Sequence, residues 1–486
     1  MRARLLFWRL VSVLLVALAL AGAIALAVWY ELERVVPQQF DSPVERFKYG
    51  SIGTEEEEGV PYWVWFALPR VFPDLLVGSD GKPRPGGYEA LGVVWEEGKE
   101  MPVGFSKKTI GFPRVGINCA LCHSGSYRTA PDQAAVIVPG APAARLDVLA
   151  YQRFLFACAS DPRFTADNLL PAIEYATKLS PVDKLLYRYG IIPQTRAAIL
   201  KTKERFAWTS SRPDWGRGRI DPFNPVKFHQ LKMDPSRDNS IGNSDMEPLW
   251  NRAARKGHSM HWDGLNDDLT EVVMSGAVGD GATAKTLPYA DLQALEQWLQ
   301  HLPSPAYPFP IDPVLAAKGG AVFRKQCSDC HAAGGKRTGT VIPLAEIQTD
   351  RHRIDMWSQA AADIYNRMPL KPPFGFQRFQ KHEGYVATPL DGLWIRAPYL
   401  HNGSVPTLED LLEPADKRPK VFFRGYDVFD RTKVGFESSG PAAEGAGFRY
   451  DTAVPGNGNG GHDGPAHGTT LPPDDKRALV EFLKTL

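Results

Sequence analysis

The sequence predicts a mainly α-helical protein with two tandem domains and long irregular loops, preceded by one N-terminal transmembrane helix. Three observations lead to this fold class. A Cys-x-x-Cys-His motif occurs twice, at 119–123 and 327–331, and the segment 286–302 repeats at 470–486. Gly and Pro are frequent, with 44 and 41 residues, which is typical of long irregular connections. Residues 10–30 contain no charged side chain.

The uncharged run 10–30 is long enough to cross the hydrocarbon core of a bilayer as a helix. Three arginines precede it and Glu31 and Glu33 follow it, so the charge bias places the N-terminus in the cytoplasm. A cleaved signal peptide, cut near Ala17-Leu18-Ala19, is the alternative. We expect residues 1–30 to be a retained inner-membrane anchor that contacts the lipid bilayer through residues 10–30. The single-pass protein then has its C-terminal body on the periplasmic side.

Cys-x-x-Cys-His is the attachment pattern for c-type haem. The two thiols form thioethers to the porphyrin vinyl groups, and the adjacent imidazole becomes the proximal iron ligand. The alternatives are a zinc knuckle or a dithiol redox pair, but neither needs a histidine directly after the second cysteine. The sequence therefore predicts two covalently bound haem c groups. They are attached through Cys119, Cys122, Cys327 and Cys330, with His123 and His331 as iron ligands.

The overall charge excludes one large class of partners. Lys and Arg total 56 and Asp and Glu total 55, which leaves a formal net charge of +1. No nucleic-acid or other polyanion partner is implied. The fifth cysteine, Cys158, lies in an apolar segment and is expected to be a small buried residue. Haem of this type is attached outside the cytoplasm, so the body of the chain is expected to be exported.

A proline-rich segment predicts the main domain boundary. Five prolines occur between positions 303 and 313, which excludes a helix or a central strand there. The N-terminal haem domain is thus expected at 31–302 and the C-terminal one at 314–486. Residues 144–207 have helical periodicity and form an insertion, which either covers the haem or forms a docking face.

The repeat indicates that one haem domain was duplicated. Residues 286–302 match 470–486 without a gap, and both copies have a Pro near the expected helix start. A looser echo relates His261-Trp262-Asp263-Gly264 to His401-Asn402-Gly403. The alternative is that two unrelated helices agree by chance.

One segment carries a family resemblance. Residues 396–404, Arg-Ala-Pro-Tyr-Leu-His-Asn-Gly-Ser, resemble the Arg…Pro-Tyr-x-His-x-Gly segment of the bacterial di-haem cytochrome c peroxidase superfamily. Residues 390–394, 399–408, 416–420 and 456–462 are most similar to its rubber-oxygenase-like branch. The resemblance covers roughly residues 110–486. It implies two tandem class I cytochrome c-like haem domains.

The resemblance also implies the remaining site residues. Peroxidase relatives use a Met or Tyr as sixth ligand of the C-terminal haem, but Glu413-Pro414-Ala415-Asp416 occupies that region here. The rubber-oxygenase branch uses a late histidine, so His462 is expected to be the ligand. His401, His467 and Met368 are the alternatives, and a structural role is favoured for His401. Trp262 is expected to relay electrons between the haems or to be an ordinary packed side chain, and Arg396 to pair with a haem propionate.

Two functional classes follow. In a peroxidase- or oxygenase-like redox enzyme, the site opposite His123 is open to peroxide or dioxygen, and the second haem relays electrons. The sequence leaves the catalytic residues unassigned; His258 and His261 lie in the right half but are more often structural. In a pure electron carrier both haems are six-coordinate, and Met246, Met260, Met274, His229 and His258 are available to the first. The expected partner is a redox protein or a membrane electron-transfer complex; the anchor favours the carrier and the resemblance favours the enzyme.

Overall fold

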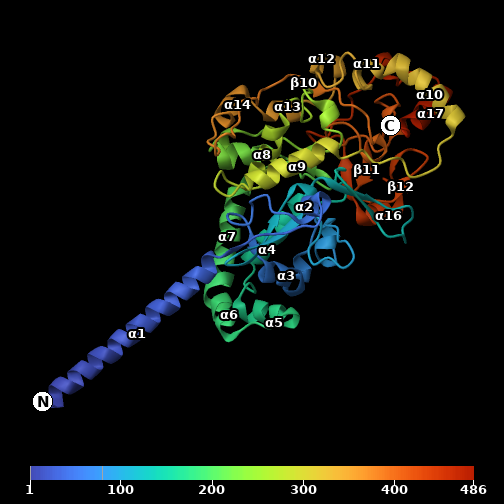
Figure 1. The fold of residues 1–486 in the computed structure, drawn as a ribbon. Coiled ribbons are helices and arrows are strands. Elements are labelled where there is room, and N and C mark those ends of the chain that lie inside the picture. The colour runs from blue at the N-terminus through green and yellow to red at the C-terminus, as the bar shows by residue number, and fades with distance from the viewer. Residues whose placement is uncertain (1, 79) are drawn as a thin grey trace.

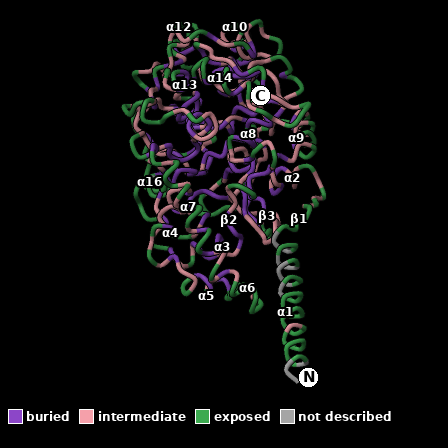
Figure 2. The backbone as a smooth tube through the Cα atoms, turned by 90° about the vertical axis from the view of Figure 1, so that its left-hand side faces the viewer, coloured by how far each residue is buried: buried purple, intermediate pink, exposed green. Residues whose placement is uncertain are grey.

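The computed structural model describes residues 2–78 and 80–486 (Figure 1). Helices hold 42% of the chain and strands 11%, so helices and the loops between them make up most of the fold. Helix α1 (Arg2–Glu33) projects from a body formed by the rest of the chain. Its described side chains are nearly all exposed (Figure 2).

The transmembrane expectation is corrected. Among the described residues, no helix is both long and apolar enough to cross a membrane. A helix that spans the hydrocarbon core needs about 20 consecutive apolar residues. The prediction of a membrane helix over 10–30 is therefore wrong. The expected single-pass inner-membrane placement is corrected with it.

The body contains sixteen further α-helices among the described residues. They are α2 (Pro43–Tyr49), α3 (Tyr62–Val71), α4 (Val148–Ser160), α5 (Ala166–Ala176), α6 (Pro181–Leu186), α7 (Ile192–Arg205), α8 (Leu269–Gly279), α9 (Tyr289–His301), α10 (Pro313–Gln326), α11 (Ser328–His331), α12 (Leu344–Ile347), α13 (His352–Met356), α14 (Gln359–Tyr365), α15 (Leu408–Leu411), α16 (Gly440–Ala446) and α17 (Pro473–Leu483). The repeated segments form α9 and α17, and the segment 144–207 forms α4 to α7.

The strands are short and antiparallel. They are β1 (Val35–Val36), β2 (Val60–Pro61), β3 (Phe105–Ile110), β4 (Phe112–Ile117), β5 (Ser124–Tyr127), β6 (Val136–Pro139), β7 (Arg219–Ile220), β8 (Ser244–Asp245), β9 (Val341–Pro343), β10 (Gly384–Val386), β11 (Val421–Arg424), β12 (Phe429–Asp430), β13 (Gly435–Phe436) and β14 (Phe448–Asp451). The largest sheet has the order β1-β3-β4-β2. The other strands pair in twos.

The β3–β4 hairpin presents the first Cys-x-x-Cys-His motif. Its tight turn contains Gly111, whose φ of +71° suits glycine. Asn118 follows β4 directly, and its side-chain oxygen accepts a hydrogen bond from the backbone N–H of Ala120 at 3.0 Å. The side-chain amide of Asn118 donates to the carbonyl of Gly50 at 2.9 Å. These bonds fix the chain at the start of the motif.

Two helices present the second motif. Asp312 caps α10 by accepting from the N–H groups of Val314 and Leu315, and Pro313 occupies the first helical position. Helix α10 packs closely on α17, because a Cβ at Gly319 would collide with the backbone of Ala478. Helix α10 ends at Gln326, one residue before the motif.

The two apolar cores each draw residues from both halves of the chain. The larger core runs from Phe47 to Phe379, and the second contains Tyr127 and Trp250 beside C-terminal residues up to Leu483. Cys158 is fully buried in the larger core, as expected for a small apolar side chain. The domain boundary at the proline-rich segment stays a prediction.

Candidate haem-binding sites

The first motif lies in a short turn between β4 and β5. The Nδ1 atom of His123 is 2.7 Å from the carbonyl oxygen of Glu247. When Nδ1–H donates to that oxygen, the opposite ring nitrogen is left free as a neutral ligand. Burial lowers the pKa of His123 to about 4, so the ring is uncharged near neutral pH. His123 is thus held in the state that iron ligation requires.

A cavity of about 780 Å³ opens beside this motif. Cys119, Cys122 and His123 all border it, so both attachment groups and the proximal imidazole face one space. The volume lies within the usual range for cofactor sites. Apolar and aromatic side chains make up much of the wall: Tyr151, Leu155, Phe156, Phe206, Trp215, Phe223, Val226 and Phe228. This lining fits a porphyrin attached through two thioethers.

The cysteines are held as neutral thiols. Burial raises the pKa of Cys119 to about 12 and that of Cys327 to about 11, and it also raises the pKa of Cys122 and of Cys330. Zinc takes cysteine as the thiolate, which these surroundings disfavour. A thioether sulfur carries no charge and suffers no such penalty. Among the described residues, no group of three or more His, Cys, Asp or Glu side chains could hold a metal ion, which favours haem attachment over the zinc alternative.

Part of the helical insertion forms a wall of the cavity. Leu155 and Phe156 of α4 and Thr202 and Arg205 of α7 border it. Of the two roles considered for residues 144–207, covering the first haem site is the one that this placement favours. Arg205 pairs with Glu58 at 2.7 Å, and both side chains also border the cavity.

Helix α8 borders the same cavity with two glycines, which carry no side chain. Gly276 and Gly279 border it, and a Cβ on Gly276 would meet no other atom within 4 Å. Asp280 follows the helix, borders the cavity and exerts its charge on Cys119 and Cys122. Burial raises the pKa of Asp280 to about 7. Sequence reasoning missed Asp280, because one acidic residue after a helix carries no signal of its own.

Trp262 and His261 border both this cavity and a smaller one of about 50 Å³. The indole N–H of Trp262 donates to the carbonyl of Asp245 at 2.8 Å. The Nε2 atom of His261 is buried without a protein partner, and its backbone has a φ of +61°. This position agrees with a relay between two haem sites, and the relay role of Trp262 stays a prediction.

The second motif repeats the support seen at the first. The Nδ1 atom of His331 lies 2.8 Å from the carbonyl oxygen of Thr388. As at His123, a backbone carbonyl can accept from Nδ1–H and leave the other nitrogen for iron. Burial again lowers the pKa of the imidazole.

His462 faces His331. Their ring centroids lie 6.2 Å apart. An iron bonded at about 2 Å to one nitrogen of each ring would hold the centroids roughly 6 Å apart, so the pair fits one six-coordinate iron. The Arg418 guanidinium fixes the loop by donating to the carbonyls of Gly461 and His462 at 2.6 and 2.9 Å. A Cβ at Gly461 would collide with Thr349, so this approach requires glycine.

The other ligand candidates lie elsewhere or further out. The ring of His401 stacks on Tyr385 at 4.1 Å, which is a packing role. The ring of His467 lies 4.6 Å from that of His462, and Met368 packs against the larger core. His462 therefore stays the predicted sixth ligand.

Arg396 has protein partners and lies in a cluster of three arginines. Its guanidinium donates to the carbonyl of Pro389 at 2.9 Å and lies 3.4 Å from the carboxylate of Asp391. It borders the 50 Å³ pocket together with Arg252 and Arg255, which sequence reasoning did not single out. Burial is the main cause that lowers the pKa of Arg396, to about 9.

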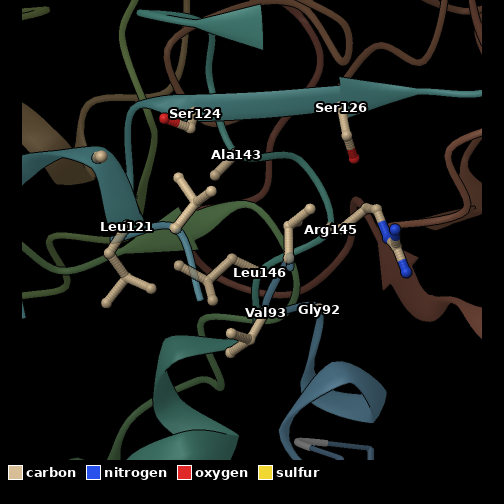
Figure 3. A pocket seen from close by; sticks show the side chains of 11 residues that line it. Gly92, Val93, Leu121, Ser124, Ser126, Ala143, Arg145 and Leu146 are labelled. Atoms are coloured by element: carbon tan, nitrogen blue, oxygen red, sulfur yellow. The ribbon is translucent and has the colours of Figure 1, made fainter. Parts of the chain in front are cut away.

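A third cavity lies behind the first motif (Figure 3). It holds about 10 Å³, which is room for about one water molecule. The hydroxyls of Ser124 and Ser126 border it, are buried and have no protein partner. Its size excludes a substrate site.

One segment of the chain matches a known protein family. Residues 384–423 match a family described as RoxA-like, cytochrome c-like. The matched range includes Thr388, which supports His331, and the whole segment 396–404. The match supports a c-type haem redox protein of the RoxA-like branch, and a cytochrome c-like domain implies covalently bound haem c.

Two relatives come from Sinorhizobium fredii. The uncharacterized protein y4iJ is 49% identical over 108 residues, which are 21% of this chain and 18% of that protein. The uncharacterized protein y4iM is 28% identical over 286 residues, which are 50% of this chain and 64% of that protein. The matched region thus spans less than two thirds of the length of either relative.

Proposed function

We propose that the protein carries two haem c groups with unequal tasks and acts as a di-haem redox enzyme of the peroxidase or oxygenase type. The haem at Cys119, Cys122 and His123 reacts with peroxide or dioxygen. The haem at Cys327, Cys330 and His331 relays electrons to it. The observation that carries the proposal is the contrast between the facing imidazoles of His331 and His462 and the 780 Å³ cavity beside His123.

The second site suits electron transfer because both faces of its iron have a protein ligand. Two imidazoles leave no coordination position for substrate. The ligands are also rigidly held, since His331 bonds to a backbone carbonyl and the His462 loop is tied to Arg418. Little rearrangement is then needed when the iron changes its oxidation state.

At the first site the cavity holds the porphyrin, and among the described residues no second imidazole faces His123 in the way that His462 faces His331, which suits small-molecule chemistry. Its aromatic walls limit access of water, and polarity and access of the distal pocket decide between ligand activation and electron transfer. Reduction of peroxide consumes protons. Asp280, whose pKa is raised to about 7 by burial, is partly protonated near neutral pH and is positioned to supply them.

A pure electron carrier is the second candidate. Met246 and His229 both border the large cavity and offer ligands for a six-coordinate first iron. In that case the cavity is filled by haem and its ligand, and the protein serves a separate redox partner.

Electron paramagnetic resonance and optical spectra of the isolated protein, with and without cyanide, distinguish the two. We expect one high-spin iron that binds cyanide and one low-spin iron that does not. Two low-spin irons that ignore cyanide and carbon monoxide in both oxidation states would refute the enzyme and leave the carrier.

A further inference from the structure

The pocket of about 50 Å³ lies between the supports of the two proximal histidines. Glu247, whose carbonyl holds His123, borders it, and so does Thr388, whose carbonyl holds His331. The pocket is therefore next to both predicted haem sites. Of the three arginines that line it, the sequence analysis singled out Arg396 alone.

Three arginines surround this pocket. Arg252, Arg255 and Arg396 all border it, and the Nε atom of each is buried without a hydrogen-bond partner. Each guanidinium keeps part of its donor set unused, although a buried charge normally pairs all of its donors. The three side chains are thus arranged to receive acceptors that the protein itself does not provide.

The protein supplies too little negative charge to balance these arginines. Asp391 pairs with Arg255 at 2.6 Å and with Arg396 at 3.4 Å. Glu247 is half-buried; burial raises the pKa of its carboxyl, and the charge of Arg252 acts in the opposite direction. Burial also lowers the pKa of Arg252 to about 10, with the charge of Arg255 acting in the same direction. Three guanidiniums thus share two neighbouring carboxyl groups, and an added anion would balance the remaining positive charge.

The cluster reaches from one haem site to the other. The charge of Arg252 acts on His123 and that of Arg396 acts on His331. Arg255 acts on both Arg252 and Arg396, and Arg252 also acts on Arg396, so the three guanidiniums influence one another. One set of guanidiniums therefore lies within electrostatic reach of both irons.

We infer that Arg252, Arg255 and Arg396 form one internal carboxylate site that holds propionates of both haems and raises both reduction potentials. This inference rests on the proposed pair of haems. Guanidinium binds carboxylate with two parallel hydrogen bonds, which suits propionate. A nearby positive charge favours the reduced iron, because reduction lowers the positive charge of the iron.

The test is a spectroelectrochemical titration of the haem-loaded protein and its variants. Arg255→Gln is expected to shift both midpoint potentials to more negative values, and Arg255→Lys to shift them less because the charge is kept. Arg252→Gln is expected to act more strongly on the first haem and Arg396→Gln on the second. Arg449→Gln is the matched control, since Arg449 is exposed and pairs with Asp451 at 3.0 Å on the surface.

The haem count and the response to acetate distinguish failure of this inference from failure of the proposed function. If Arg255→Gln moves neither potential, or only one, while pyridine haemochrome still counts two haems, the shared site is refuted and the proposed function stands. A count of one haem in the wild type would refute the proposed function instead. A free carboxylate in the pocket would make the wild-type potentials respond to added acetate at constant ionic strength, and that response would overturn the propionate assignment.

Discussion

The two Cys-x-x-Cys-His motifs have the same spacing and the same carbonyl support, yet their surroundings differ. At the first, a β-hairpin presents His123 to a cavity that α4, α7 and α8 line. At the second, α10 and α17 close on each other and a late loop brings His462 to His331. The proximal half of each site is thus repeated, and the distal half is where they diverge. We expect the elements far from each motif in sequence to decide which of the two proposed irons stays open.

The largest expected effect comes from removing one attachment. Cys119→Ser with Cys122→Ser leaves the second motif intact, because that motif is mounted on α10 and not on the β3–β4 hairpin. The pyridine haemochrome assay should fall from two haems to one per chain. The matched variant Cys327→Ser with Cys330→Ser should give the same count but keep the haem that binds cyanide. An unchanged count of two in either variant contradicts the attachment assignment.

The next largest effect should follow from opening the closed site. His462→Ala removes one of the two facing imidazoles, so one low-spin iron should become high-spin or bind added cyanide. His301→Ala is the control, because His301 is exposed at the end of α9. His467→Ala tests the neighbouring imidazole as the alternative ligand. Persistence of the low-spin signal of the second haem in His462→Ala would mean that another residue is the ligand.

Alanine substitutions of glycines in α10 and α8 test whether one helix face is packed and the other is open. Gly319→Ala places a methyl group against the backbone of Ala478 and should lower the free energy of unfolding by about 3 kcal/mol or more. Gly276→Ala faces the cavity without a neighbour within 4 Å and should raise helix stability by up to about 1 kcal/mol. Urea unfolding measures both. Equal losses in the two variants would contradict the difference between a packed and an open helix face.

The smallest expected effect is a pH dependence that belongs to the open site. The pKa of Asp280 is about 7 in the folded protein and near 4 when unfolded, so its protonated form favours folding at low pH. That contribution is fully present below about pH 4 and is lost as the pH rises through 7. The free energy of unfolding of Asp280→Asn should therefore equal that of the wild type at pH 4 and exceed it by roughly 2 kcal/mol at pH 8. This is about half of the free energy that corresponds to three pKa units, because the carboxyl borders a cavity.

Unfolding at both pH values, with Asp291→Asn as an exposed control, measures this difference. A difference between Asp280→Asn and wild type that does not change between pH 4 and pH 8 would contradict the raised pKa.

The sequence predicted the features that depend on local patterns. The two motifs, the amphipathic segments that form α9 and α17, the helical region 144–207 and the burial of Cys158 follow from spacing and periodicity. His462 was reached through family resemblance, and its glycine-rich loop is the local reason why the approach is possible. The pairing of His462 with His331 across the fold is consistent with that expectation.

Other features depend on distant contacts and left no local signal. Asp280, the two glycines of α8 that border the cavity and the cluster of Arg252, Arg255 and Arg396 are brought together only by the fold. The prediction at 10–30 rested on a long uncharged run with arginines before it and glutamates after it, and no described helix is long and apolar enough to cross a membrane.

The central claim is that one iron is open and the other closed. Titration of the oxidised protein with cyanide, followed optically, counts the accessible irons directly. The account predicts one cyanide bound per chain in the wild type and two in His462→Ala. No bound cyanide, or two in the wild type, would contradict it.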